Sequence, residues 1–173
     1  RLLMDTLRAE ALGFLGITDA ATHSEMHYRY PTALKMYIEK GVELELLSPH
    51  LLEYDLTILG EALQADRDQQ FTYLGLQTLY DRYFIHSGGV RFELPQVFYM
   101  RVAMGLASNE ENREERAIEF YNLISSFDYM VSTPQLFNSG TLRPQLSSCF
   151  LTTVPDDLHG IYSAIKDNAM LSK

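Results

Sequence analysis

The sequence changes character near Asp128, and this change constrains the fold more than any other feature. Over residues 1–130, apolar residues recur at helical spacing in one segment after another. Over residues 131–173, turn-forming residues precede a single β-rich run, residues 148–154, and one amphipathic segment follows it. We therefore predict a mainly α-helical domain at 1–130, followed at 131–173 by a loop, a strand and a helix.

Local signals divide the first part into six expected helices. Proline opens two of them, because its missing N–H is harmless in a first turn. Pro31 is expected to begin a helix that ends at Gly41, and Pro95 to begin another. The other four are expected at residues 1–16, from Ser48-Pro49 to about 64, from about 72, and from the charged run 109–116 to about 126.

Two more signals mark a hairpin and a last helix. Gly88-Gly89 is expected to form the turn between two short strands, since such turns favour glycine. Pro155-Asp156-Asp157 predicts a helix start with aspartate as the N-cap, and the helix should run to the last residue. The strand expected at 148–154 has no visible partner, and a lone strand is not a stable element.

The composition excludes several classes of protein. A net charge of −9 and a pI near 4.9 argue against nucleic-acid binding, which needs a basic surface. We find no apolar run long enough to span a membrane and no signal-peptide pattern. The single cysteine excludes an internal disulfide and favours a reducing, cytoplasmic location. Because the chain starts at Arg1 in helical pattern, we expect a truncation or processing point there.

Three clusters are better explained by structure than by chemistry. His23 and His27, with Glu25 between them, resemble a zinc pair, but no third ligand is evident and no metal site is predicted. For the run Asp66-Arg67-Asp68, ion pairing that braces a loop is a better explanation than a role in an active site. The tyrosines at 73, 80 and 83 favour packing over a radical or stacking pathway.

The segment TPQLFNSGTLRPQLSSCFL, residues 133–151, holds the lone Cys149. A free cysteine is usually a small buried apolar residue. Here, however, hydroxyls cluster in a turn-rich loop, which suits a polar or phosphorylated ligand that the thiol could face; they belong to Thr133, Ser139, Thr141, Ser147 and Ser148. Asp156-Asp157-Leu158 is explained either as a helix cap or as a carboxylate that binds a ribose hydroxyl.

This segment resembles the substrate-loop signature of the large, catalytic α subunit of aerobic (class I) ribonucleoside-diphosphate reductases. The upstream DRDQQFTYLGLQTLYDRYF resembles the helical N-terminal domain of that subunit, and YSAIKDNAMLSK resembles its first barrel helix. The resemblance covers about residues 35–173, and Gln135 is a small departure. It implies a helical domain, with the ATP cone absent or residual, leading into the first strand and helix of a ten-stranded α/β barrel.

The resemblance also implies residue roles. Cys149 matches the first cysteine of a pair that reduces the ribose 2′ carbon after a thiyl radical abstracts the 3′ hydrogen. Thr133 and Ser148 match residues that hold the substrate diphosphate and ribose, beside Cys149. Asp156, Asp157 and Leu158 match the start of a deoxynucleotide effector site at the α–α dimer interface, to which the last helix would contribute.

The implied partners follow from what this chain does not contain. No cofactor is expected in this chain; the effectors would be dNTP and ATP, and a separate metal-containing β subunit would supply the radical. The thiyl cysteine, the second reducing cysteine and the redox tail would lie in the remainder of the α subunit. Thioredoxin or glutaredoxin would restore the dithiol. The chain alone should therefore be inactive.

Three other hypotheses stay open from the sequence. An adenosylcobalamin-dependent reductase shares the barrel and a similar Ser-Cys loop. A non-catalytic fragment that binds nucleotide or assists assembly belongs to a different class. A helical domain with a purely structural cysteine is the simplest alternative, and it predicts no nucleotide binding.

Overall fold

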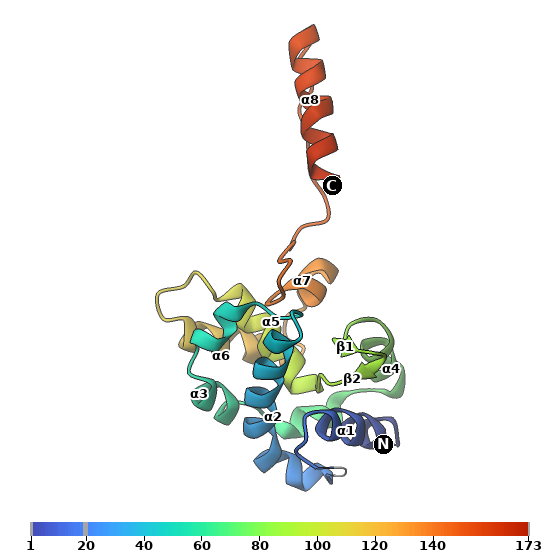
Figure 1. Ribbon diagram of the computed structural model, residues 1–173, viewed down its shortest axis with the longest axis vertical. Coiled ribbons are helices and arrows are strands. Elements are labelled where there is room, and N and C mark those ends of the chain that lie inside the picture. Colours follow the sequence, from blue (N-terminus) through green and yellow to red (C-terminus); the bar gives the residue numbers. More distant parts are fainter. Residues whose placement is uncertain (1, 19–20, 173) are drawn as a thin grey trace.

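Helices are the main elements of this chain, as Figure 1 shows for the computed structural model, which describes residues 2–18 and 21–172. The expected helix bounds at residues 1 and 173 lie outside the described residues. The first elements are α1 (Leu2–Phe14), α2 (His23–Glu43), the 3-10 helix η1 (Pro49–Glu53), α3 (Leu56–Glu61), the 3-10 helix η2 (Ala65–Gln70) and α4 (Tyr73–Arg82). A hairpin of β1 (His86–Ser87) and β2 (Val90–Arg91) precedes α5 (Pro95–Leu106), α6 (Arg113–Ser125), α7 (Thr133–Asn138) and α8 (Leu158–Leu171).

The helix α5 is the centre of the helical body. All of its residues from Pro95 to Met104 are buried, as expected of a helix that other elements surround on every side. It packs against α6, α2 and α7. The predicted start at Pro95 is confirmed, with proline in the first turn.

The hairpin turn is also confirmed. β1 and β2 pair antiparallel, with His86 opposite Arg91 and Ser87 opposite Val90. Gly88 and Gly89 have φ values of 59° and 86°. Two consecutive positive φ angles are what a two-residue turn of this kind requires, and glycine adopts them without a steric cost.

The predicted start of the second helix at Pro31 is wrong. The helix α2 begins eight residues earlier, because Thr22 and Glu25 form a capping box: the Thr22 N–H donates to the Glu25 carboxylate over 2.7 Å. Pro31 therefore lies inside the helix, where one backbone hydrogen bond is missing. The helix α3 packs closely against α2 at Pro31, since a Cβ on Gly60 would lie 2.9 Å from the Pro31 Cα.

Two more boundaries differ from the sequence prediction. The helix expected from Pro49 to about 64 is divided into η1 and α3, because Asp55 caps a new helix by accepting from the N–H groups of Thr57 and Ile58. The breaker-rich segment after Ser132 contains α7, which was not predicted. Ser132 and Gln135 form its capping box, and Pro134 is tolerated in its first turn.

The strand predicted at residues 148–154 is not formed. Residues 142–157 contain no helix or strand in the part of the chain that the structure describes, and residues 147–155 are exposed. A strand needs a neighbour to pair with, and this chain offers none at that position. The first barrel strand therefore stays a prediction.

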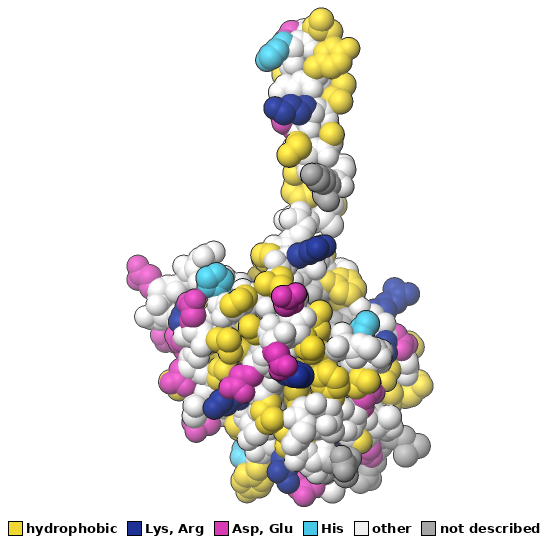
Figure 2. Space-filling view, in the orientation of Figure 1, with side chains coloured by type: hydrophobic (Ala, Val, Ile, Leu, Met, Phe, Trp, Pro, Cys, Tyr) yellow, Lys and Arg dark blue, Asp and Glu magenta, His cyan; other side chains and the backbone are white. Residues whose placement is uncertain are grey.

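The last helix, α8, projects away from the helical body (Figure 1). Its predicted start is confirmed, with the Asp157 carboxylate accepting from the Gly160 N–H over 2.9 Å. Figure 2 shows apolar side chains along it, and the exposed ones are Leu158, Ile161, Tyr162, Ile165, Met170 and Leu171. None of the described helices is long and apolar enough to cross a membrane.

Tyr54 gives the fold a testable dependence on pH. Its hydroxyl donates to the Met104 carbonyl over 2.7 Å and ties the end of η1 to α5. Burial raises the pKa of Tyr54 to about 12. Since this folded-state pKa exceeds that of an unfolded tyrosine, about 10, the stability it supports is complete below about pH 10 and is lost as the pH rises towards 12.

We therefore expect Tyr54→Phe to lower the free energy of unfolding at pH 8 by about 1 kcal/mol, the value of one hydrogen bond. The difference in the free energy of unfolding between the variant and the wild type should then become smaller as the pH rises through 11. Urea unfolding at both pH values measures this, with the exposed Tyr73→Phe as a control. A difference that stays constant with pH would contradict the stabilising role of the Tyr54 hydroxyl.

Candidate functional site

The predicted site residues lie on α7, on the segment that leads from it to α8, and at the first residue of α8. Cys149 is a free, exposed thiol, so the expectation of a small buried core residue is not supported. The Ser148 hydroxyl lies 3.9 Å from its Sγ. Asn138, at the end of α7, donates to the Gln145 carbonyl over 2.7 Å and holds the start of this segment.

A buried ion pair fixes the end of α7 to the helical body. Arg101 on α5 and Glu93 are both fully buried, and Arg101 Nε donates to Glu93 Oε1 over 2.7 Å. The two terminal nitrogens of Arg101 reach the backbone of α7, donating to the Ser139 carbonyl over 2.6 Å and the Leu136 carbonyl over 3.1 Å. One guanidinium therefore satisfies a buried carboxylate and two carbonyls at a helix end.

Glu93 extends this network to two more elements. Its carboxylate accepts from the Tyr37 hydroxyl on α2 over 2.6 Å and from the Ile85 N–H, just before β1, over 2.9 Å. Burial opposes the charge on Arg101, but the Glu93 carboxylate and the Tyr37 hydroxyl together outweigh burial and raise the pKa of Arg101. Burial and the same carboxylate raise the pKa of Tyr37 well above its usual value, so this hydroxyl stays a donor.

Close backbone packing reinforces the same contact. A Cβ on Gly105 of α5 would lie 2.2 Å from the Gly140 backbone nitrogen, so only glycine fits there. The Ser139 hydroxyl donates to the Val102 carbonyl over 2.8 Å, and the Gly140 carbonyl accepts from the Ser48 N–H over 3.0 Å. The chain that follows α7 therefore leaves the helical body from a fixed point.

The beginning of α7 lies against the end of α4. Thr133, the first residue of α7, is exposed, and its Oγ1 lies 3.4 Å from the Tyr83 hydroxyl oxygen. The Tyr83 ring stacks on Phe137 with a centroid separation of 4.6 Å and an interplanar angle of 14°. These contacts place the Thr133 hydroxyl at the surface, where a ligand can reach it.

The structure brings only some of the predicted residues together. Among the described residues, no hydrogen bond joins Thr133 to Ser148 or Cys149. Asp156 and Leu158 are exposed at the start of α8. Asp157 forms the N-cap described above, so the cap interpretation of this aspartate is confirmed.

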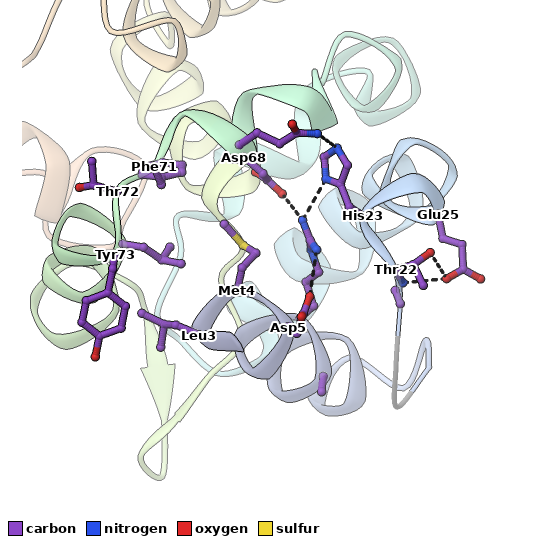
Figure 3. A pocket seen from close by; sticks show the side chains of 15 residues that line it. Leu3, Met4, Asp5, Thr22, His23, Glu25, Asp68, Phe71, Thr72 and Tyr73 are labelled. Atoms are coloured by element: carbon purple, nitrogen blue, oxygen red, sulfur yellow. Dashed lines mark hydrogen bonds and ion pairs between the residues drawn. The ribbon is translucent and has the colours of Figure 1, made fainter. Parts of the chain in front are cut away.

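A second polar cluster lies at the opposite end of the body, in a cavity of about 690 Å³ between α1, α2, η2 and α4 (Figure 3). Asp68 accepts from Arg8 over 3.2 Å, from Tyr30 over 2.8 Å and from Gln96 over 2.8 Å. Burial raises the pKa of Asp68, and hydrogen bonds from Gln96 and Tyr30 act against that rise. The predicted ion-pairing role of this charged run is confirmed for Asp68.

The histidine pair is divided between different surroundings. His23 lies beside this cluster, with Nε2 3.2 Å from Asp66 and Nδ1 3.2 Å from Arg8. His27 packs against the Tyr28 ring instead. Within residues 2–18 and 21–172, no group of three histidine, cysteine, aspartate or glutamate side chains is arranged to hold a metal ion.

Sequence reasoning missed the roles of Arg101 and Glu93. A signal was present, because Arg101 stands on the apolar stripe of the helix expected from Pro95, in a run of otherwise apolar residues. Charged residues are almost never fully buried unless they are paired. The partner carbonyls, however, lie 35 and 38 residues away in the sequence, and only the folded structure shows them.

Comparisons with known proteins agree with this architecture. Residues 69–144, from η2 to just beyond α7, match the family model described as "Ribonucleotide reductase, all-alpha domain". This match covers the part of the helical body from η2 to α7 and leaves α1, α2, η1 and α3 outside it.

Curated relatives extend the similarity to the whole chain. It is 48 % identical to the ribonucleoside-diphosphate reductase subunit alpha of Chlamydia trachomatis over 172 residues, which are 99 % of this chain and 16 % of that protein. It is 38 % identical to the Helicobacter pylori subunit alpha, covering 100 % of this chain and 20 % of the relative. The large chain of Schizosaccharomyces pombe is 45 % identical over 116 residues, which are 66 % of this chain and 14 % of that protein.

The chain belongs to the family of ribonucleoside-diphosphate reductase large subunits. It spans about one-sixth to one-fifth of the length of these bacterial relatives.

The buried pair predicts a large loss of stability on substitution. Arg101→Met removes the partner of a fully buried carboxylate and two carbonyls, so the free energy of unfolding should fall by about 3–5 kcal/mol. Urea unfolding followed by circular dichroism measures it. The matched control is Arg116→Met, which breaks the exposed pair with Glu119 and should change little. Equal losses for the two variants would show that the buried network does not anchor α7.

Proposed function

We propose that this chain forms the N-terminal helical domain and the start of the catalytic barrel of an α subunit that reduces ribonucleoside diphosphates to deoxyribonucleoside diphosphates, for DNA precursor synthesis in the cytoplasm. The observation that carries the proposal is an exposed thiol, Cys149, on a segment that the buried Arg101 network anchors to a ribonucleotide reductase all-α domain. Similarity along the whole chain to subunits with that named activity supports it.

The chemistry assigns one half of a dithiol to this chain. Reduction replaces the C2′–OH bond of the ribose by C2′–H and releases water, while two thiols give up two electrons and two protons and become a disulfide. Cys149 supplies one thiol, and it is the only cysteine in this sequence. The second thiol, and the thiyl radical that begins the reaction, must come from the remainder of the subunit.

The chain's own residues would bind and orient the nucleotide. The exposed Thr133 hydroxyl suits a diphosphate oxygen, and the Ser148 hydroxyl, next to the thiol, suits the ribose. Because Arg101 holds the Leu136 and Ser139 carbonyls and the Tyr83 ring stacks on Phe137, α7 is fixed and the Thr133 hydroxyl is preorganised for binding.

Partners and effectors follow from the same proposal. A β subunit containing a metal centre would generate the radical, and thioredoxin or glutaredoxin would reduce the disulfide. The exposed apolar side chains of α8 suit an α–α dimer, with a deoxynucleotide effector at Asp156, Asp157 and Leu158. The adenosylcobalamin-dependent alternative is not favoured, because the curated relatives reported above are ribonucleoside-diphosphate reductase subunits.

Replacing Cys149 tests the proposal directly. In the full-length subunit, supplied with its β subunit and thioredoxin, Cys149→Ser should lower turnover about 10³-fold or more, because one thiol cannot form a disulfide. Deoxyribonucleotide formation is measured, with Ser147→Ala as the neighbouring control. Turnover that survives Cys149→Ser would exclude this role and leave a non-catalytic fragment as the better description.

The effector assignment has its own test. Asp157 is engaged in the helix cap, whereas Asp156 makes no hydrogen bond or ion pair with the described residues. Asp156→Asn should therefore weaken deoxynucleotide binding to the full-length dimer about tenfold without unfolding α8. Equilibrium dialysis measures the affinity, and Asp167→Asn, within α8, is the control. Unchanged affinity in the Asp156 variant would remove this residue from the effector site.

A further inference from the structure

We infer that Tyr83 is a further substrate-binding residue, whose hydroxyl donates, together with Thr133, to the diphosphate of the ribonucleotide. This inference rests on the proposed function, because it concerns the same nucleotide site. The sequence assigned Tyr83 to packing, with Tyr73 and Tyr80. The geometry around its hydroxyl points to binding instead.

The two hydroxyls come from distant parts of the chain and meet at the surface. Tyr83 Oη and Thr133 Oγ1 lie 3.4 Å apart, although 50 residues separate them in the sequence. Hydrogen bonds between hydroxyls normally span about 2.5–3.0 Å, so this contact is longer than an ordinary one. Each hydroxyl therefore keeps a proton that it can donate to a third group.

The Tyr83 ring is held in place without its hydroxyl. Thr133 and Phe137 are four residues apart on α7, so both side chains lie on one face of that helix. The Tyr83 ring stacks on Phe137, and its hydroxyl reaches back to Thr133. The following residue, Phe84, is buried in the core. Packing thus fixes the direction of the hydroxyl before any ligand arrives.

Other tyrosines show what a purely structural hydroxyl looks like here. Five of them donate to a protein group at 2.8 Å or less, namely Tyr30, Tyr37, Tyr54, Tyr80 and Tyr121. Tyr80, three residues before Tyr83, donates to Glu10 over 2.7 Å. Tyr83 has a positioned ring, but within residues 2–18 and 21–172 its hydroxyl makes only the long contact with Thr133. Its hydroxyl points toward Thr133, the residue of α7 that we propose binds the diphosphate.

The buried ion pair sets the spacing of the two hydroxyls. Glu93 accepts from the Ile85 N–H, two residues after Tyr83, and Arg101 donates to the Leu136 carbonyl, three residues after Thr133. The two hydroxyls therefore stand on one rigid frame. A phosphate oxygen is the acceptor that fits, because two neutral donors can share an anionic oxygen, and hydrogen bonds to a charged acceptor are the stronger ones.

The test is Tyr83→Phe in the full-length subunit with its β subunit and thioredoxin. This change removes the hydroxyl and keeps the ring that stacks on Phe137. We expect KM for a ribonucleoside diphosphate to rise about tenfold, as for loss of one hydrogen bond to a charged group, while kcat stays within about twofold. The urea midpoint should match wild type. Tyr73→Phe, an exposed tyrosine on α4, should leave KM unchanged.

A second experiment distinguishes failure of the Tyr83 inference from failure of the proposed function. Thr133→Val and the double variant are measured for binding of the ribonucleoside diphosphate by equilibrium dialysis. A double variant little weaker than either single variant would support a shared phosphate oxygen. If Thr133→Val weakens binding and Tyr83→Phe does not, the Tyr83 inference is overturned while the proposed function stands. If the wild-type subunit neither binds nor reduces the diphosphate, the proposed function fails, and the inference fails with it.

Discussion

The contact between Arg101 and Glu93 is the interaction on which the rest of the structure depends. Burying two charges is costly, and such a pair is stable only when further hydrogen bonds satisfy its remaining donors and acceptors. Here the further partners are backbone groups of α7, the backbone before β1, and a tyrosine of α2. An apolar pair of the same volume would leave the carbonyls of Leu136 and Ser139 buried without donors. The ion pair therefore specifies where the segment after α6 attaches, and not only how the core is filled.

This attachment connects the helical domain to the site. Thr133 stands at one end of α7 and the anchored carbonyls at the other, so a shift of α5 would move the Thr133 hydroxyl. The close contact of Gly105 with Gly140 leaves no room for such a shift in one direction. Residues of α5, far in the sequence from Thr133, thus set the position of the hydroxyl that would contact the nucleotide. The helical body would in this sense support the proposed substrate loop.

The sequence predicted those elements whose signals are local. Gly88-Gly89 requires only its own backbone geometry, and α5 and α8 begin at a proline and an aspartate whose roles are set within one turn. The start of α2 is predicted too late because Pro31 is a strong local signal and the Thr22–Glu25 capping box was not recognised, and α7 was missed because its capping box lies among turn formers. Among the candidate site residues, the hydroxyl-rich loop around Cys149 indicated a thiol that faces a ligand, and the family resemblance added its catalytic role. The role of Arg101 depends on contacts more than 30 residues away, which no local pattern encodes.

The two halves of the proposed site differ in how they are held. Thr133 and Tyr83 stand on a frame of buried hydrogen bonds that this chain provides by itself. Ser148 and Cys149 lie in an exposed segment without a strand partner, and α8 beyond them presents apolar side chains to water. The free-energy cost of exposed apolar surface and of unpaired backbone groups is removed when a partner covers them. In the proposed site, the diphosphate end would therefore be preformed in the helical domain, whereas the thiol would take its final position only when the remainder of the subunit paired with the segment that carries it.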